Sequence, residues 1–142
     1  MGIIGLGSIG SEVARLSQQF GMRVIGMRRS PQGDEPCETW PTSRLRELLP
    51  RSAHIINVGR GQLIDERALI EALQSGHIGG AALDVFVVGP LPTDNPLWDM
   101  PNVIVTPHSA GGTVLATQRA ANMFADNLGR YLRGQPMLNE VT

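Results

Sequence analysis

The chain has 142 residues, 42% of them hydrophobic and 18% charged, and its formal net charge at pH 7 is −1. This length suits one domain, the composition excludes a disordered chain, and the small net charge argues against a general nucleic-acid binder. Cys37 is the only cysteine and no long apolar run is present, so we expect no disulfide, no membrane span and a cytoplasmic location.

The first part of the chain predicts strands separated by helices. Gly2 to Leu6 is short and apolar, which is typical of a buried strand. A helix follows, because Ile9, Val13, Leu16 and Phe20 recur at helical spacing before Gly21. We then expect a strand from Arg23 to Met27, a loop from Ser30 to Pro41 and a short helix from Ser43 to Leu49.

The second part continues this alternation. The predicted strands are His54 to Val58, Gly80 to Phe86 and Asn102 to Thr106. Asp65 is a suitable N-cap for a helix that ends at Gly76, and a long helix is expected from Thr113 to Arg133. A proline-rich loop covers 87–101. Continuous apolar strands that alternate with helices predict an α/β fold with a doubly wound parallel sheet.

The strongest motif is GLGSIG, which spans Gly5 to Gly10. It follows a predicted strand and opens a predicted helix, which is the context of a dinucleotide-binding turn. The helix N-terminus and the bare backbone N–H groups favour a phosphate there. The expected cofactor contacts at the turn are Leu6, Gly7, Ser8 and Ile9.

The segment Arg28-Arg29-Ser30 begins 18 residues after Gly10, where an NAD site usually has an acidic residue for the ribose hydroxyl. Arginine can instead bind a 2′-phosphate through paired hydrogen bonds. These residues favour NADP, as NADPH, over NAD, although NAD stays possible; two solvated arginines in a turn are the structural alternative.

Candidate catalytic residues follow the strands of the second part. Arg60 lies in Val58-Gly59-Arg60, and a guanidinium there suits the carboxylate and carbonyl of a small 2-oxo acid. His108 can donate a proton to a carbonyl that receives a hydride, because its pKa lies near neutral. Asp84 ends another strand at the same edge and can accept from a carboxamide, or it is a turn residue. We expect no metal site.

Four motifs in order, GLGSIG, NVGRGQLID, GGAALDVF and PLWDMPNVIVTPHSAGG, resemble the D-2-hydroxyacid dehydrogenase family, and most closely its glyoxylate and hydroxypyruvate reductases. The resemblance covers nearly the whole chain. It implies that Arg60 binds substrate, that His108 is the acid/base, and that the chain is a homodimer. The implied cofactor contacts are Leu6 to Ile9, Arg28 to Ser30, Val58 to Arg60, Asp84, His108 and Ala110.

The chain differs from that family in three ways. We expect 1–142 to be the NAD(P)-binding domain alone, with 113–142 as the helix and tail that would cross to a substrate domain. A strand–helix unit of the family has no counterpart between Leu49 and Ser52. Gly89 takes the place of the glutamate that orients the histidine, and an imidazolium without a carboxylate loses its proton more readily.

Three functions are therefore weighed. The first is hydride transfer between NADPH and a 2-oxo acid such as glyoxylate or hydroxypyruvate. The second is a dinucleotide-binding fragment or pseudoenzyme with little turnover, which Gly89 and the expected absence of the substrate domain favour. The third, an S-adenosyl ligand on the glycine turn, gives no role to Arg60 and His108.

Overall fold

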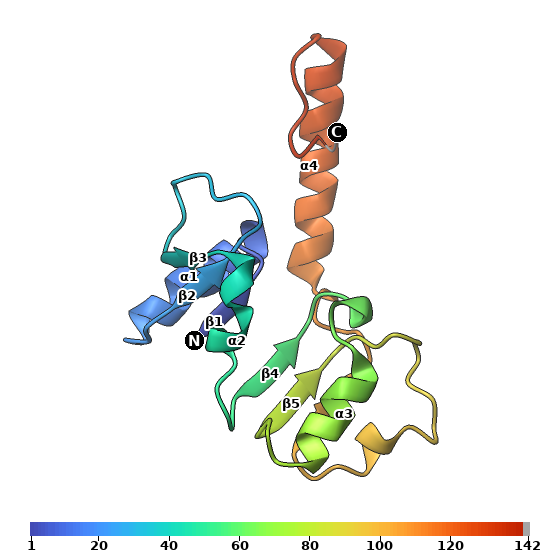
Figure 1. The fold of residues 1–142 in the computed structure, drawn as a ribbon. Coiled ribbons are helices and arrows are strands. Elements are labelled where there is room, and N and C mark those ends of the chain that lie inside the picture. The colour runs from blue at the N-terminus through green and yellow to red at the C-terminus, as the bar shows by residue number, and fades with distance from the viewer. Residues whose placement is uncertain (141–142) are drawn as a thin grey trace. The chain divides into compact units, whose positions relative to one another are not determined.

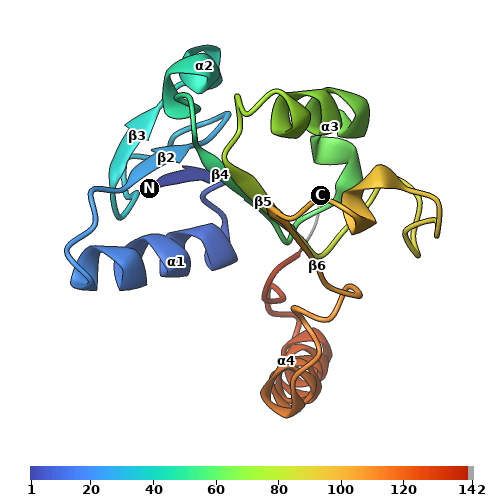
Figure 2. The ribbon, with the colours of Figure 1, turned by 90° about the horizontal axis from the view of Figure 1, so that it is seen from below.

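The structure is a computed structural model, and it describes residues 1–140. The chain forms two compact units. The first unit comprises Met1–Ala53 with Gly76–Gly79, and the second unit comprises His54–Ser75 with the chain from Gly80 onward. Each unit contains one three-stranded parallel sheet (Figures 1 and 2).

The sheet of the first unit has the strand order β1-β2-β3. The strands are β1 (Gly2–Ile4), β2 (Ile25–Met27) and β3 (Glu38–Trp40), and all pairs are parallel. The helices are α1 (Ser8–Gln19), a 3₁₀ turn (Thr42–Arg44) and α2 (Leu45–Leu48). The expected helices and the first two strands are thus present with shorter bounds.

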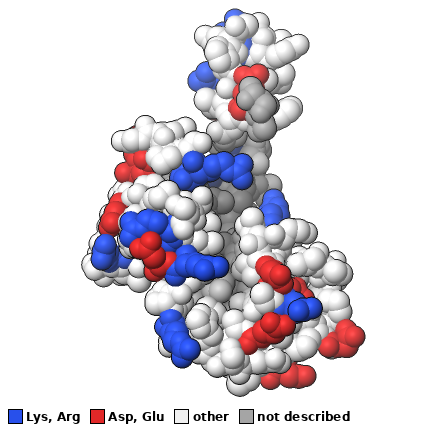
Figure 3. Space-filling model, in the orientation of Figure 1, with Lys and Arg blue, Asp and Glu red and all other residues white. Residues whose placement is uncertain are grey.

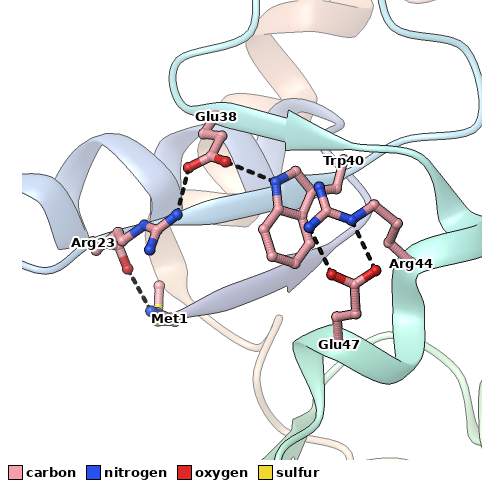
Figure 4. Close-up of polar contacts among 6 residues, drawn as sticks. All are labelled: Met1, Arg23, Glu38, Trp40, Arg44 and Glu47. Carbon is pink, nitrogen blue, oxygen red and sulfur yellow. Dashed lines mark hydrogen bonds and ion pairs between the residues drawn. The ribbon is translucent and has the colours of Figure 1, made fainter.

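The strand β3 corrects the prediction of a loop from Ser30 to Pro41. Its sequence, Glu-Thr-Trp, is a short polar–aromatic segment that pairs with β2, and its side chains contact neighbouring segments (Figure 4). Glu38 accepts hydrogen bonds from the indole of Trp40 at 2.7 Å and from Arg23 at 3.1 Å. The Arg44 guanidinium lies 3.6 Å from the centre of the Trp40 ring and pairs with Glu47. Backbone pairing with β2 places β3 in the sheet, and the side-chain contacts connect it to Arg23 and to the start of α2.

The core of the first unit is small, and small residues of α1 face it. Leu6, Ala14 and Val24 form the buried cluster. The apolar side of α1 that marked the helix in the sequence faces outward, because Ile9 is 75% and Phe20 is 84% exposed. An alanine and a serine, Ala14 and Ser17, are the buried residues of this helix. Small side chains allow the helix to lie close to the sheet.

The sheet of the second unit has the order β4-β5-β6. Its strands are β4 (His54–Asn57), β5 (Gly80–Leu83) and β6 (Val103–Val105), all parallel and each shorter than expected. The helices are α3 (Glu66–Gln74) and α4 (Val114–Leu132), with 3₁₀ turns at Gly61–Leu63 and Pro96–Trp98. Asp65 caps α3 as predicted, since its carboxylate accepts from the N–H of Ala68 at 3.0 Å.

One face of this second sheet is covered and the other is bare. The helix α3 lies over β5 (Figure 2), and its residues Leu69 and Leu73 are buried, as is Leu83 of β5. Ile56 of β4 and Ile104 of β6 remain exposed. Because side chains alternate between the faces of a strand, these exposed isoleucines indicate an apolar face that the described residues leave uncovered.

The long helix α4 is capped by Thr113 and has no buried residue. Phe124 is 71% exposed, and Leu128 and Tyr131 are exposed with it, so no segment of the described residues covers the apolar side of this helix. In Figure 1 the helix leads away from the β4–β6 sheet. Val141 and Thr142, the end of the expected tail 113–142, lie outside the described residues.

The predicted α/β fold with parallel strands is confirmed, with the strands in two separate sheets. On the face shown in Figure 3, basic and acidic side chains are interspersed, and neither sign forms a continuous surface. Within residues 1–140, no helix has the length and apolarity needed to cross a membrane.

Candidate functional site

The glycine turn of the first unit has the geometry of an anion site. Gly5 has φ +97°, a conformation that favours glycine, and its N–H donates to the carbonyl of Met27. A Cβ on Gly10 would lie 2.0 Å from the Gly5 carbonyl oxygen, so only glycine lets α1 approach the turn. A Cβ on Gly7 would meet nothing within 4 Å, so its surface is open.

A pocket of about 370 Å³ lies at this turn, and residues at the start of α1 line it. Gly7 is the N-cap of α1, and no side chain caps the helix. The N–H groups of the first helical turn are therefore available to a bound anion, which the helix dipole also favours. The lining residues are Leu6, Gly7, Ser8, Ser11, Arg15, Arg28, Gln32, Asp34, Glu35 and Pro36.

Four of the predicted contacts line this pocket, namely Leu6, Gly7, Ser8 and Arg28. Ile9, Arg29 and Ser30 are not among its lining residues. The sequence analysis missed Ser11 and Arg15, which helical spacing places one turn beyond Gly7 and Ser11 respectively. No sequence pattern pointed to the loop residues Gln32, Asp34, Glu35 and Pro36, which also line the pocket.

Arg28 has a partner within the chain. Its guanidinium lies 3.7 Å from a carboxylate oxygen of Glu35. That carboxylate also accepts from the backbone N–H groups of Gln32 and Gly33, at 2.6 and 2.9 Å. The cation that the sequence assigned to a 2′-phosphate is thus paired with an internal anion.

In the second unit, the turn that carries Arg60 is held by Asn57, a residue that the sequence analysis left without a role. The buried Asn57 side chain donates to the carbonyl of Arg60 at 3.0 Å and accepts from the N–H of Gly59 at 3.1 Å. A Cβ on Gly61 would lie 2.0 Å from the backbone of Phe86, which fixes glycine there. Arg60 itself is exposed, at the carboxyl end of β4.

Asp84 fixes the loop that carries His108. Its carboxylate accepts from the Thr106 hydroxyl at 2.5 Å and from the N–H groups of Ser109 and Ala110 at 2.9 and 3.0 Å. These donors, Thr106 first and then Ala110 and Ser109, hold the pKa of Asp84 below its ordinary value, although burial opposes them. His108 between them has φ +55° and is exposed.

The predicted catalytic side chains therefore follow β4 and β6 at one edge of one sheet, with Asp84 after β5 between them. The carboxyl ends of parallel strands are where ligands bind in open α/β sheets. Val58, Gly59 and Ala110 belong to the same two loops. Gly89 has open space around it, and the described residues include no group of His, Cys, Asp and Glu that could hold a metal.

Comparison with known proteins gives a consistent result. Residues 1–55 and 40–110 match the family described as D-isomer specific 2-hydroxyacid dehydrogenase, NAD binding domain. The "Glyoxylate reductase" of Aeropyrum pernix is 34% identical over 171 residues, which cover 99% of this chain and 51% of the relative. The "D-3-phosphoglycerate dehydrogenase" of Bacillus subtilis is 36% identical over 171 residues, covering 99% of this chain and 32% of that protein.

A similar solved structure is that of a D-isomer specific 2-hydroxyacid dehydrogenase from Xanthobacter autotrophicus, in complex with NADPH and MES. It is 36% identical, with a TM-score of 0.91 over 100% of this chain and 70% of that chain. The chain thus spans about half the length, or less, of the two relatives above.

The alignments also contain a gap. An alignment over 171 residues with a chain of 142 leaves at least 29 positions of the relative unmatched. The family match divides in two where its segments overlap, at residues 40–55. This agrees with the expected loss of a strand–helix unit between Leu49 and Ser52, because such a unit takes roughly 30 residues.

Proposed function

This chain belongs to the D-isomer specific 2-hydroxyacid dehydrogenase family, and we propose that it is the cofactor-binding part of an NADPH-dependent reductase of small 2-oxo acids. The observation that carries the proposal is the arrangement of Arg60, Asp84 and His108 at the carboxyl edge of one parallel sheet. Glyoxylate and hydroxypyruvate are the proposed substrates. The chain is also similar to a phosphoglycerate dehydrogenase, so other 2-hydroxy acids are further candidate substrates for the same type of reaction.

The residues at the glycine turn suit a dinucleotide. The open surface of Gly7, the uncapped start of α1 and the guanidinium of Arg28 supply donors for phosphate oxygens. Leu6, Ser8 and Ile9 would flank the pyrophosphate, and Arg28, Arg29 and Ser30 would bind the 2′-phosphate. Val58, Gly59, Asp84 and Ala110 would line the nicotinamide end.

A bound nicotinamide would supply the hydride. The guanidinium of Arg60 would bind the carboxylate and polarise the carbonyl of the 2-oxo acid, which stabilises the negative charge that develops on oxygen. His108 would donate a proton to that oxygen. Asp84 would act as a positioning residue, because its hydrogen bonds to Ser109 and Ala110 fix the loop on which His108 lies.

The test measures oxidation of NADPH by its absorbance, with hydroxypyruvate and glyoxylate as substrates. We expect turnover that falls about 100-fold or more in Arg60→Ala, since loss of one donor to a developing oxyanion has this cost. His108→Gln should lower turnover by a similar factor while NADPH affinity is retained. Turnover that survives in both variants would exclude the proposed roles.

A dinucleotide-binding module with little turnover is the second candidate. Gly89 favours it, because the glutamate that orients the histidine in the family has no counterpart at that position. NADPH binding by calorimetry without any oxidation would select this candidate. Binding of S-adenosylmethionine without NADPH binding would exclude both.

The remaining proposals concern assembly. We propose that 113–142 crosses to a substrate domain, because the apolar side of α4 is exposed in this chain. A homodimer and a cytoplasmic location complete the proposal, and sedimentation of the purified chain tests the first of these.

A further inference from the structure

The pocket at the glycine turn contains a carboxylate that belongs to the chain itself. The side chain of Glu35 is only 7% exposed, and it lines this pocket together with Arg28. One of its oxygens accepts from the N–H of Gln32 and lies 3.7 Å from the Arg28 guanidinium, while the other accepts from the N–H of Gly33. Each carboxylate oxygen of Glu35 therefore accepts a hydrogen bond from a backbone N–H group of this loop.

The same donors would suit a phosphate group. Two successive backbone N–H groups, at a loop where Gly33 has φ +85°, form a concave donor surface, and a guanidinium adds a positive charge. Carboxylate and phosphate oxygens both accept from such charged donors. The Gln32 N–H above all, and less strongly the Gly33 N–H and the Arg28 charge, hold the pKa of Glu35 below its ordinary value, so it is ionised at neutral pH.

We propose that Glu35 is a specificity-determining residue that competes with the cofactor's 2′-phosphate for Arg28 and for the Gln32 and Gly33 N–H groups. The inference rests on the proposed function, because it concerns the same dinucleotide pocket. A 2′-phosphate reaches Arg28 only when the Glu35 carboxylate withdraws, since two anions cannot share these donors without repulsion. NADH carries a neutral 2′-hydroxyl, so it can bind while the Glu35 carboxylate stays in place. Glu35 therefore weakens the binding of NADPH relative to NADH and reduces the preference for NADPH.

The experiment isolates the 2′-phosphate by comparing adenosine 2′,5′-bisphosphate with adenosine 5′-monophosphate in calorimetric titrations. Glu35→Gln removes the charge and keeps the side-chain shape. Asp34→Asn is the matched control, because it removes a neighbouring charge from the lining of the same pocket. Thermal unfolding of each variant checks that the fold is retained, and Glu35→Ala provides a second variant that also empties the donors.

We expect Glu35→Gln to tighten binding of the bisphosphate about five- to tenfold, because like charges at close range repel each other and the loop can relieve part of this repulsion. The monophosphate should change less than twofold in every variant, and Asp34→Asn should change the ratio of the two affinities less than twofold. Glu35→Ala should shift this ratio at least as far as Glu35→Gln.

The inference is overturned if the ratio is unchanged in both Glu35 variants, if Asp34→Asn shifts it equally, or if neither nucleotide binds. Its failure is distinguishable from failure of the proposed function. A shifted ratio without NADPH oxidation would support the role of Glu35 and contradict the reductase. Oxidation of NADPH with an unchanged ratio would do the reverse.

Discussion

Two buried residues fix the loops that carry the candidate catalytic side chains, through hydrogen bonds to the backbone. Asn57 fixes the turn of Arg60, and Asp84 fixes the loop of His108. Both side chains are buried, and each joins chain segments that follow the ends of strands. Their polar atoms are satisfied only in this arrangement, so substitutions should act on loop position before they act on the fold.

The first prediction concerns acid stability at Asp84. Its pKa is lower in the fold than its ordinary value of 3.8, so the folded state binds this proton less readily than the unfolded chain. The stabilisation is complete above the ordinary pKa and is lost as the pH falls through the folded pKa. We expect Asp84→Asn to lower the melting temperature by several degrees at pH 7, and this difference should shrink at about pH 3.

Circular dichroism of the two proteins at both pH values measures this difference. Asp94→Asn, at an exposed loop position, is the control and should melt like the wild type at pH 7. An equal gap between wild type and Asp84→Asn at both pH values would contradict the assigned role of the carboxylate.

The second prediction contrasts two glycines of the turn. Gly10→Ala would place a Cβ 2.0 Å from the Gly5 oxygen, so we expect a loss of about 1–3 kcal/mol in the free energy of unfolding. Gly7→Ala meets no atom within 4 Å, so stability should change by less than about 0.5 kcal/mol. Denaturant titration measures both.

Gly7→Ala should nevertheless weaken NADPH binding, because the added methyl group occupies the surface that a pyrophosphate would approach. Calorimetry measures this effect. If NADPH binds equally to Gly7→Ala and to the wild type, the pyrophosphate does not lie on this turn.

At the scale of elements, each sheet has an edge strand with unmet pairing capacity. β1 is at one end of the order β1-β2-β3, and β4 is at one end of β4-β5-β6. Exposed strand edges present N–H and C=O groups that can pair with another strand. The position between Pro50 and Arg51, where the family has a further strand–helix unit, lies in the sequence between β3 of the first sheet and β4 of the second sheet.

The third prediction follows from those edges. Insertion of the matching segment of about 30 residues from a relative, between Pro50 and Arg51, should raise the melting temperature and slow hydrogen exchange at the amides of β1 and β4. A Gly/Ser segment of equal length is the control and should do neither. Unchanged exchange in both proteins would show that these edges do not need that unit.

The fourth prediction concerns the helix α4. Phe124 is exposed and contributes little to the folded chain, so Phe124→Glu should change the free energy of unfolding by less than about 0.5 kcal/mol. It should also reduce concentration-dependent self-association, because exposed apolar patches promote contact between molecules. Analytical ultracentrifugation compares it with Arg119→Glu, which changes charge on the same helix without removing an apolar side chain.

For the molecule as a whole, we propose that turnover requires a substrate domain together with this cofactor-binding part. The fifth prediction is that Gly89→Glu raises turnover when the chain is fused to the substrate domain of a relative. By the family resemblance, a carboxylate at this position orients the histidine, and open space around Gly89 accommodates the longer side chain. Gly89→Gln, which has the same size without the charge, is the control. Equal rates in the two fusions would refute the role assigned to position 89.

Local patterns in the sequence were enough to predict many of the helices and strands. GLGSIG, the Asp65 cap and the apolar runs predicted the turn, α3 and the strands, because the turn, the cap and the alternation of apolar runs with helices are all visible in short stretches of sequence. The strand β3 could not be predicted in this way. It pairs with β2, and Glu38 accepts a hydrogen bond from Arg23, so its position depends on residues that are distant in sequence.

Residue type and short spacing were enough to predict the family and the glycine turn, and to name Arg60 and His108 as candidate catalytic residues. Three features became visible only in the folded chain: Asn57 and Asp84 fix the loops of those residues, small side chains of α1 face the core, and Glu35 forms an ion pair with Arg28. The physical reason is that hydrogen bonds, burial and ion pairs depend on distances in space, which the folded chain alone sets.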